Sequence, residues 1–202
     1  MSAIEDAYVK GWIDGRIHEE EGYEERNARA AEHRSKIEKT AVRIIFLDID
    51  GVLNNYLERE GHRQLSDRCV GLLNRLTDET GAKIVLSSTW RLGKSLEEIQ
   101  VMAKDLGITG EVIGRTEDLR GKHPSIVRGN EIDHWINTNT DIIGDKYVFR
   151  NYVILDDDCD MLYFQRNNYV NCDPAVGITE RTVFKAKAIL LNKSCEDVYQ
   201  EV

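Results

Sequence analysis

The sequence predicts one α/β domain in which helices cover both faces of a parallel sheet. Short apolar segments alternate with amphipathic segments from Val42 onward, and this alternation is typical of βαβ units. The segments RIIFL at 43–47 and YVIL at 152–155 are apolar along almost their whole length, as expected for strands buried on both faces. The chain length of 202 residues suits one substantial domain with an appendage.

The apolar and amphipathic segments predict the individual elements. We expect strands at 42–47, 83–86, 111–113, 152–155 and 169–171. We expect helices at 67–80, 95–106, 129–139 and 179–191. In parallel sheets of this kind, ligands bind at the carboxyl ends of the strands, so the residues that follow each strand are the candidates for chemistry.

Residues 1–40 differ from the rest of the chain in their charge content and in the spacing of their apolar residues. Apolar residues recur at near-helical spacing until Gly22, and a second, highly charged segment follows. We therefore expect a helical N-terminal extension over 1–40, attached to the α/β domain at 41–202. An extension of this kind also offers a contact for a homo-oligomer.

Charge and cysteine usage exclude several classes of protein. The net charge of -9 argues against a general polyanion binder, which would carry a basic face. The sequence has no run of 18 apolar residues and no apolar signal core, so we expect no membrane segment. The four cysteines form no CxxC pair and have no matching histidine spacing, which indicates reduced thiols in a cytoplasmic protein.

Two acidic clusters follow two of the predicted strands. Asp48 and Asp50 come directly after the first strand, and Gly51 permits a sharp turn behind them. Asp156 and Asp157 end the fourth strand. Like charges brought this close need a cation or a shared proton, and hard carboxylate oxygens are the ligands that Mg²⁺ prefers. The sequence therefore predicts a Mg²⁺ site at this edge of the sheet.

Hydroxyls and cations follow the remaining strands. Ser87 and Ser88 end the second strand and can donate hydrogen bonds to a phosphate, and Arg91 could add a charged fork. Arg128 stands at the start of a predicted helix, where a cation and the helix N-terminus both face an anion, and Lys122 competes for this role. Each motif alone could be a turn or a helix cap. The acid pair, the hydroxyl, the cation and the second acid pair, in this order on a parallel sheet, together predict a catalytic site.

These motifs resemble a known superfamily. DIDGVLN at 48–54 resembles the DxDG signature of the haloacid dehalogenase (HAD) superfamily. The segments LSSTWR, RGNEIDHWI, YVILDDDCDM and NCDPAVGIT are similar to the HAD-like domain of multifunctional RNA-repair proteins and their phage relatives. The resemblance covers about 42–192 and implies a HAD-like, Rossmann-like three-layer sandwich.

The resemblance also implies a reaction, a Mg²⁺-dependent hydrolysis of phosphomonoesters. Asp48 would be the nucleophile and form an aspartyl-phosphate, and Asp50 would act as general acid and then as general base. Asp48, the backbone carbonyl of Asp50, and Asp156 or Asp157 would hold the Mg²⁺ ion.

The phosphoryl oxygens would be stabilised by a hydroxyl and a cation. Ser87 or Ser88 would supply the hydroxyl, and Arg128 or Lys122 the cation. The cation of this superfamily is more usually a lysine, so an arginine at 128 is a departure from its pattern.

The lengths of two loops limit the size of any cap and so indicate the kind of substrate. The segments 54–65 and 114–127 are too short for a sizeable folded cap, so we expect an open site that admits a large substrate. Cations expected near its mouth are Arg59, His62, Arg63, Arg91 and Lys94. We therefore expect the terminal phosphate of a nucleic acid, or a nucleotide, as substrate. The alternatives are a phosphatase for small non-nucleotide phosphates and a catalytically silent HAD fold that acts as a binding or adaptor protein.

Overall fold

The computed structural model describes residues 22, 24–25, 42–57, 64–121, 123, 125–144, 151–194 and 197–198. The chain divides into two units, Met1–Thr40 and Ala41–Val202, and the second carries the elements described below. The helical extension and the oligomer contact expected of the first unit fall almost entirely outside the described residues, so both stay predictions.

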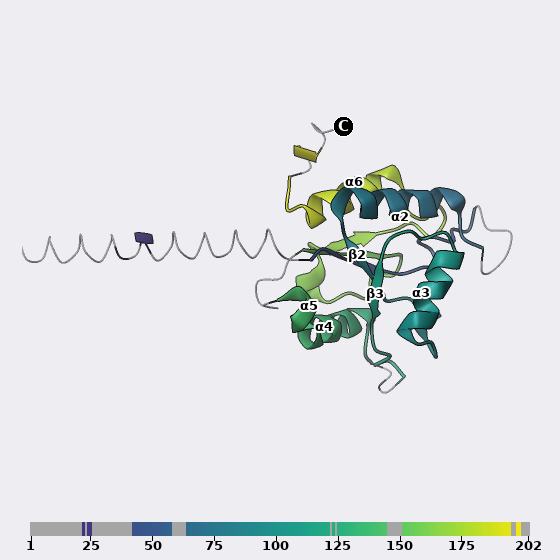
Figure 1. Cartoon of the computed structure of the whole chain (residues 1–202), viewed down its shortest axis with the longest axis horizontal. Helices are drawn as coiled ribbons and strands as arrows, with labels where there is room; N and C mark the ends of the chain where they lie inside the picture. The colour runs from purple at the N-terminus through teal and green to yellow at the C-terminus, as the bar shows by residue number, and fades with distance from the viewer. Residues whose placement is uncertain are drawn as a thin grey trace, which may run out of the picture. The chain divides into compact units, whose positions relative to one another are not determined.

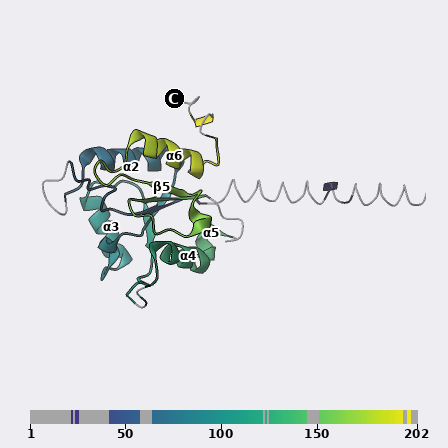
Figure 2. The same ribbon diagram turned by 180° about the vertical axis from the view of Figure 1, so that it is seen from behind.

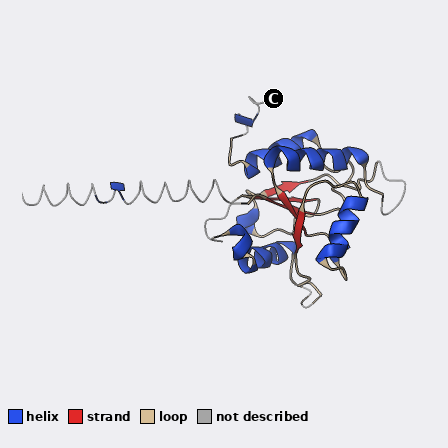
Figure 3. Cartoon of the chain, viewed as in Figure 1, coloured by secondary structure: helices blue, strands red, loops and turns tan. Residues whose placement is uncertain are grey.

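Five parallel strands form one sheet, as predicted. They are β1 (Ile44–Leu47), β2 (Lys83–Leu86), β3 (Val112–Arg115), β4 (Tyr152–Asp156) and β5 (Tyr169–Asn171). Their order in the sheet is β3-β2-β1-β4-β5, so β1 lies between β2 and β4. Figure 3 shows the strands in red with the blue helices around them. This order brings the two acidic segments together, because β1 and β4 are neighbours although they are far apart in the chain.

Helices cover both faces of this sheet. They are α2 (Asp67–Thr80), α3 (Leu96–Asp105), α4 (Arg128–Thr138), α5 (Thr140–Ile143) and α6 (Glu180–Leu190). Helices α2 and α6 lie side by side over one face, and α4 and α5 lie on the other side (Figures 1 and 2). The sequence did not predict α5, a single turn that follows Asn139. No described segment forms a cap over the sheet, in agreement with the expected uncapped α/β sandwich.

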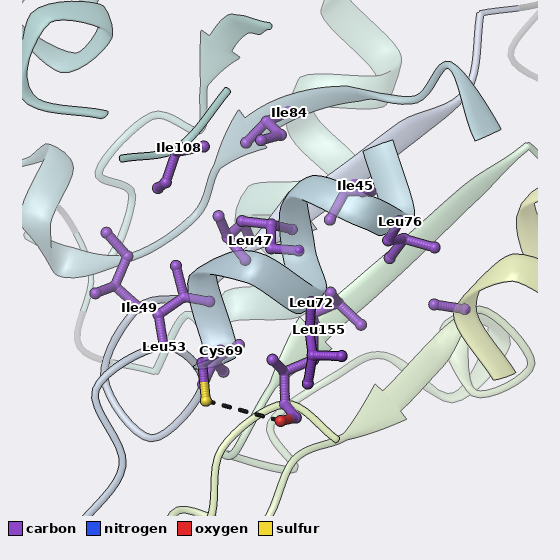
Figure 4. Packing of buried hydrophobic residues seen from close by; sticks show 14 of the residues in the cluster. Ile45, Leu47, Ile49, Leu53, Cys69, Leu72, Leu76, Ile84, Ile108 and Leu155 are labelled. Carbon is purple, nitrogen blue, oxygen red and sulfur yellow. Dashed lines mark hydrogen bonds between the residues drawn. The ribbon is translucent and has the colours of Figure 1, made fainter. Parts of the chain in front are cut away.

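Alternating side chains of the strands pack into two separate hydrophobic cores, one on each face of the sheet. Ile45 and Leu47 point towards α2, where they join Leu76 and other apolar residues (Figure 4). Ile44 and Phe46 point towards α4, and the Phe46 ring packs edge-on against Trp135 at 5.4 Å between centroids. The next residue of even number is Asp48, which places it on the α4 side. No helix in the described part of the chain combines the length and apolar character needed to cross a bilayer.

Candidate active site

The strand register sets three predicted site residues side by side. Leu47 of β1 pairs with Leu86 of β2 and with Leu155 of β4. The residues that follow are Asp48, Ser87 and Asp156, and they therefore occupy the same rank at the carboxyl edge of the sheet. Backbone hydrogen bonds continue through this rank, because the Asp48 N–H donates to the Leu155 carbonyl and the Ser87 N–H to the Leu47 carbonyl, both at 2.9 Å.

Three carboxylates gather at this edge. Asp48, Asp156 and Asp157 each offer one oxygen, and these oxygens all lie within 4.8 Å of one another. Asp48 and Asp156 are buried, and the Oδ2 atom of Asp156 accepts no hydrogen bond from the described residues. Burial and the nearby Asp48 charge raise the pKa of Asp156 to about 7, and the same two causes raise the pKa of Asp157. A cluster of hard oxygen ligands with an unfilled buried acceptor fits a divalent cation such as Mg²⁺.

Gly51 allows the loop after β1 to approach the loop after β4. Its φ of +71° belongs to the left-handed region, which disfavours residues with a side chain. A Cβ atom here would lie only 2.2 Å from Oδ2 of Asp157. The glycine after the acid pair is therefore needed for its conformation and for the space that it leaves to Asp157.

Asp50 is exposed, and two donors hold its carboxylate. The side-chain amide of Asn54 donates to Oδ1 at 2.6 Å, and the indole N–H of Trp90 donates to Oδ2 at 2.9 Å. Asn54 also accepts the Gly51 N–H through its own Oδ1 at 3.0 Å, which closes the turn. Trp90 was not among the predicted site residues, and the signal that could have found it is its place two residues after Ser88.

The two serines after β2 have different surroundings. Ser88 Oγ accepts the Trp90 N–H at 3.4 Å and caps the 3₁₀ turn Thr89–Arg91. Ser87 Oγ is fully buried and has no hydrogen-bond partner among the described residues. A buried hydroxyl beside Asp48 with no partner is the better candidate for contact with a bound phosphate.

Arg128 brings a cation to the carboxylates. It is the first residue of α4, and its Nη1 atom donates to Oδ1 of Asp48 at 2.9 Å and lies 3.3 Å from Oδ2 of Asp156. Burial alone would lower the pKa of Arg128, but the charges of Asp48 and Asp156 outweigh it, and the pKa is raised. Lys122, the competing candidate, lies outside the described residues.

Arg91 has a different set of partners from the phosphate contact that we expected. Its side chain is buried, and its five N–H groups face four backbone carbonyls and the carboxylate of Glu131. Burial lowers the pKa of Arg91, while the Glu131 charge opposes this shift. Because its donors are occupied inside the protein, Arg91 is a structural clamp between loops and does not make the substrate contact that the sequence predicted.

The other cations expected at the mouth of the site fall into two groups. Arg59, His62 and Arg63 lie outside the described residues. Lys94 lies in the loop after β2, and its Nζ donates to the Trp90 carbonyl at 2.9 Å. Their role towards a substrate stays a prediction.

Comparison with known proteins places this site in a family. The family model described as "HAD domain in Swiss Army Knife RNA repair proteins" matches residues 44–183, which is more than half of the chain. The match begins in β1, ends in α6 and includes all the site residues described above. Searches of curated proteins and of solved structures find no match.

Proposed function

We propose, from the premise that this chain belongs to the family of HAD domains in Swiss Army Knife RNA repair proteins, that it is a Mg²⁺-dependent phosphomonoester hydrolase. The family points to a hydrolase of phosphatase type. The observation that carries the finer proposal is the meeting of Asp48, Asp156 and Asp157 beneath Arg128. This arrangement places a candidate nucleophile, Asp48, next to oxygen ligands for Mg²⁺ and next to the Arg128 guanidinium, which can bind the phosphate.

Mg²⁺ fits the donor set of the site. The carboxylates of Asp48, Asp156 and Asp157 would hold it together with the backbone carbonyl of Asp50. When bound, Mg²⁺ would screen the repulsion between the Asp48 carboxylate and the phosphate ester.

Asp48 is the nucleophile in this proposal. Its carboxylate attacks the phosphorus atom, the bond from phosphorus to the leaving oxygen breaks, and an aspartyl-phosphate forms. The hydrogen bond from Arg128 to Oδ1 fixes the orientation of this carboxylate before the attack. Ser87, with its unpartnered hydroxyl, and Arg128 stabilise the oxygens of the transferring group, and Lys122 is the alternative cation.

Asp50 carries the protons. As an acid it protonates the leaving oxygen, and as a base it then removes a proton from the water that attacks the phosphorus of the phospho-enzyme. Phosphate leaves and Asp48 is restored. The hydrogen bonds from Asn54 and Trp90 support this role because they fix the Asp50 carboxylate two residues beyond the nucleophile.

The terminal phosphate of a nucleic acid, or a nucleotide, is the proposed substrate. The RNA-repair description of the family supports it, as does the lack of a folded cap in the described part of the chain. The scattered cysteines support a cytoplasmic location. A panel of 3′- and 5′-phosphorylated RNA, DNA and mononucleotides tests the substrate, and activity on sugar phosphates alone would contradict it.

Hydrolysis of p-nitrophenyl phosphate tests the chemistry. We expect turnover with Mg²⁺, none with EDTA, and a loss of at least about 10⁴-fold in Asp48→Asn. Asp158→Asn is the matched control, because Asp158 is an exposed acid next to the cluster but outside it. Equal rates for the protein and Asp48→Asn would remove Asp48 as the nucleophile.

A further inference from the structure

We propose that Arg91 and Glu131, a buried ion pair outside the carboxylate cluster, position Ser87 and Arg128 for the reaction. The pair touches neither the carboxylates nor the expected place of the phosphate. It acts through the backbone that carries the two residues. This inference rests on the proposed function and adds positioning residues to it.

Arg91 holds the end of β2 in place. Its Nη1 atom donates to the carbonyl oxygens of Ser87 at 2.7 Å and of Ser88 at 2.9 Å. Its Nε atom donates to the Thr116 carbonyl at 2.9 Å, just after β3. One guanidinium therefore fixes the peptide that follows Ser87 and the next peptide along the chain, and so holds the backbone that carries the Ser87 side chain.

Glu131 connects this clamp to the helix that carries Arg128. Its Oε2 accepts from Nη2 of Arg91 at 2.6 Å, and the side chains of both residues are 3% exposed. Its Oε1 accepts the backbone N–H groups of Leu119 at 3.0 Å and Arg120 at 3.3 Å. Glu131 lies three residues after Arg128, in the first turn of α4.

A second connection returns from the same loop to Arg128. The Arg120 guanidinium pairs with the carboxylate of Asp160. Oδ2 of Asp160 in turn accepts the backbone N–H of Arg128 at 3.1 Å. The first turn of α4 is thus tied to the loops after β2, β3 and β4, which are the loops that surround the site.

Stability alone does not account for a buried pair of this kind. Apolar residues of similar volume often replace such a pair without loss of stability, because they avoid the desolvation of two charges. They cannot hold backbone carbonyls, and a lysine cannot replace the planar fork of an arginine. The geometry therefore gives the pair a role in which the direction of several hydrogen bonds matters.

The full-length double variant Arg91→Met/Glu131→Met tests this role. We expect a folded protein of lower thermal stability, because several backbone groups lose their partners, and a kcat for p-nitrophenyl phosphate about 100-fold lower, with KM changed much less. The control Arg75→Gln/Glu180→Gln removes an exposed ion pair that joins α2 to α6, and we expect no change in kcat. A double variant with the same stability and the same kcat as the unmodified protein would overturn the proposal.

Arg91→Lys decides the matter if the double variant does not fold. It keeps the charge opposite Glu131 but loses the fork, and we expect kcat to fall about 10-fold at an unchanged KM. An unchanged kcat in Arg91→Lys would overturn the proposal.

A readout without activity separates this inference from the proposed function. A crystal structure of the double variant, or of Arg91→Lys if the double variant does not fold, should show Ser87 and Arg128 displaced relative to Asp48. Unchanged positions would overturn the positioning role. If the unmodified protein hydrolyses none of the phosphate esters, the proposed function fails, and this structural comparison still decides whether the pair positions the two residues.

Discussion

The carboxyl edge of the sheet has two halves that differ in how completely their buried charged groups are paired. At β1 and β4, Asp48, Asp156 and Arg128 meet in a small space, and in the described structure Oδ2 of Asp156 accepts no hydrogen bond. At β2 and β3, every N–H group of Arg91 and both carboxylate oxygens of Glu131 have partners. Buried charged groups in folded proteins are normally paired, so we propose the incomplete half as the one that receives a ligand.

The difference predicts where substitutions act. In the incomplete half, changes should alter activity and metal binding more than stability, because Oδ2 of Asp156 has no hydrogen bond to lose in the described structure. In the complete half, removal of one partner leaves a buried charge without compensation and costs about 3–5 kcal/mol of unfolding free energy. The following predictions sharpen or break this comparison, beginning with the largest effect.

Arg128→Met should lower kcat/KM by about 10²–10³-fold, because it removes the cation that faces Asp48 and Asp156. Arg128→Lys is the matched variant. It restores a charge of the kind usual at this place in the superfamily, and we expect it to keep activity within about 10-fold. Steady-state kinetics on p-nitrophenyl phosphate, with urea unfolding as the parallel measurement, checks both variants. A Met variant that loses stability but not activity would reverse the assignment of the two halves.

Much of this site was predictable because strand ends are predictable. The five strands follow from short apolar segments, and their carboxyl ends share one edge because the strands are parallel. The order of the strands in the sheet came from the structure. Once β1 and β4 are neighbours, Asp48 and Asp156 must lie close together, and the sequence alone placed the acids there. The mainly apolar strands are strong signals because both of their faces are buried.

The hydrogen-bond partners of individual side chains were not predictable. The 3₁₀ turn after Ser88 decides that Ser88 Oγ caps a turn while Ser87 Oγ is left unpartnered, and the sequence does not mark this turn. The same turn sends the Arg91 side chain inward to Glu131, so an arginine that follows a phosphate-binding pattern became a clamp. A pattern of residue types fixes which groups share an edge, whereas the pairing among them depends on a single residue of backbone turn.

Gly51→Ala should weaken activation by Mg²⁺ about 10-fold and lower the unfolding free energy by about 1–3 kcal/mol. The strain comes from the φ of +71°, and the weaker activation comes from the displacement of Asp157 by the new methyl group. Gly81→Ala separates the two causes. Its φ is +66°, but a Cβ atom there meets nothing within 4 Å, so it should lose stability without losing Mg²⁺ activation. Mg²⁺ titrations of activity that shift equally in both variants would exclude contact with Asp157 as the cause.

Trp90→Phe should have the smallest effect, and it tests a contact between the loop after β2 and the loop after β1. The variant removes the indole N–H that donates to Oδ2 of Asp50 at 2.9 Å and keeps an aromatic ring in its place. Loss of a hydrogen bond worth about 1 kcal/mol corresponds to about a 5-fold fall in kcat for substrates with an alkyl leaving group. The fall should be smaller for p-nitrophenyl phosphate, because p-nitrophenolate leaves readily without a proton from Asp50. Trp135→Phe, a similar change in the core on the α4 side, should affect both substrates equally. If Trp90→Phe also lowers both rates by the same factor, Trp90 packs the loop and does not orient Asp50. The complete half would then contribute to the reaction through Arg91 and Glu131 alone.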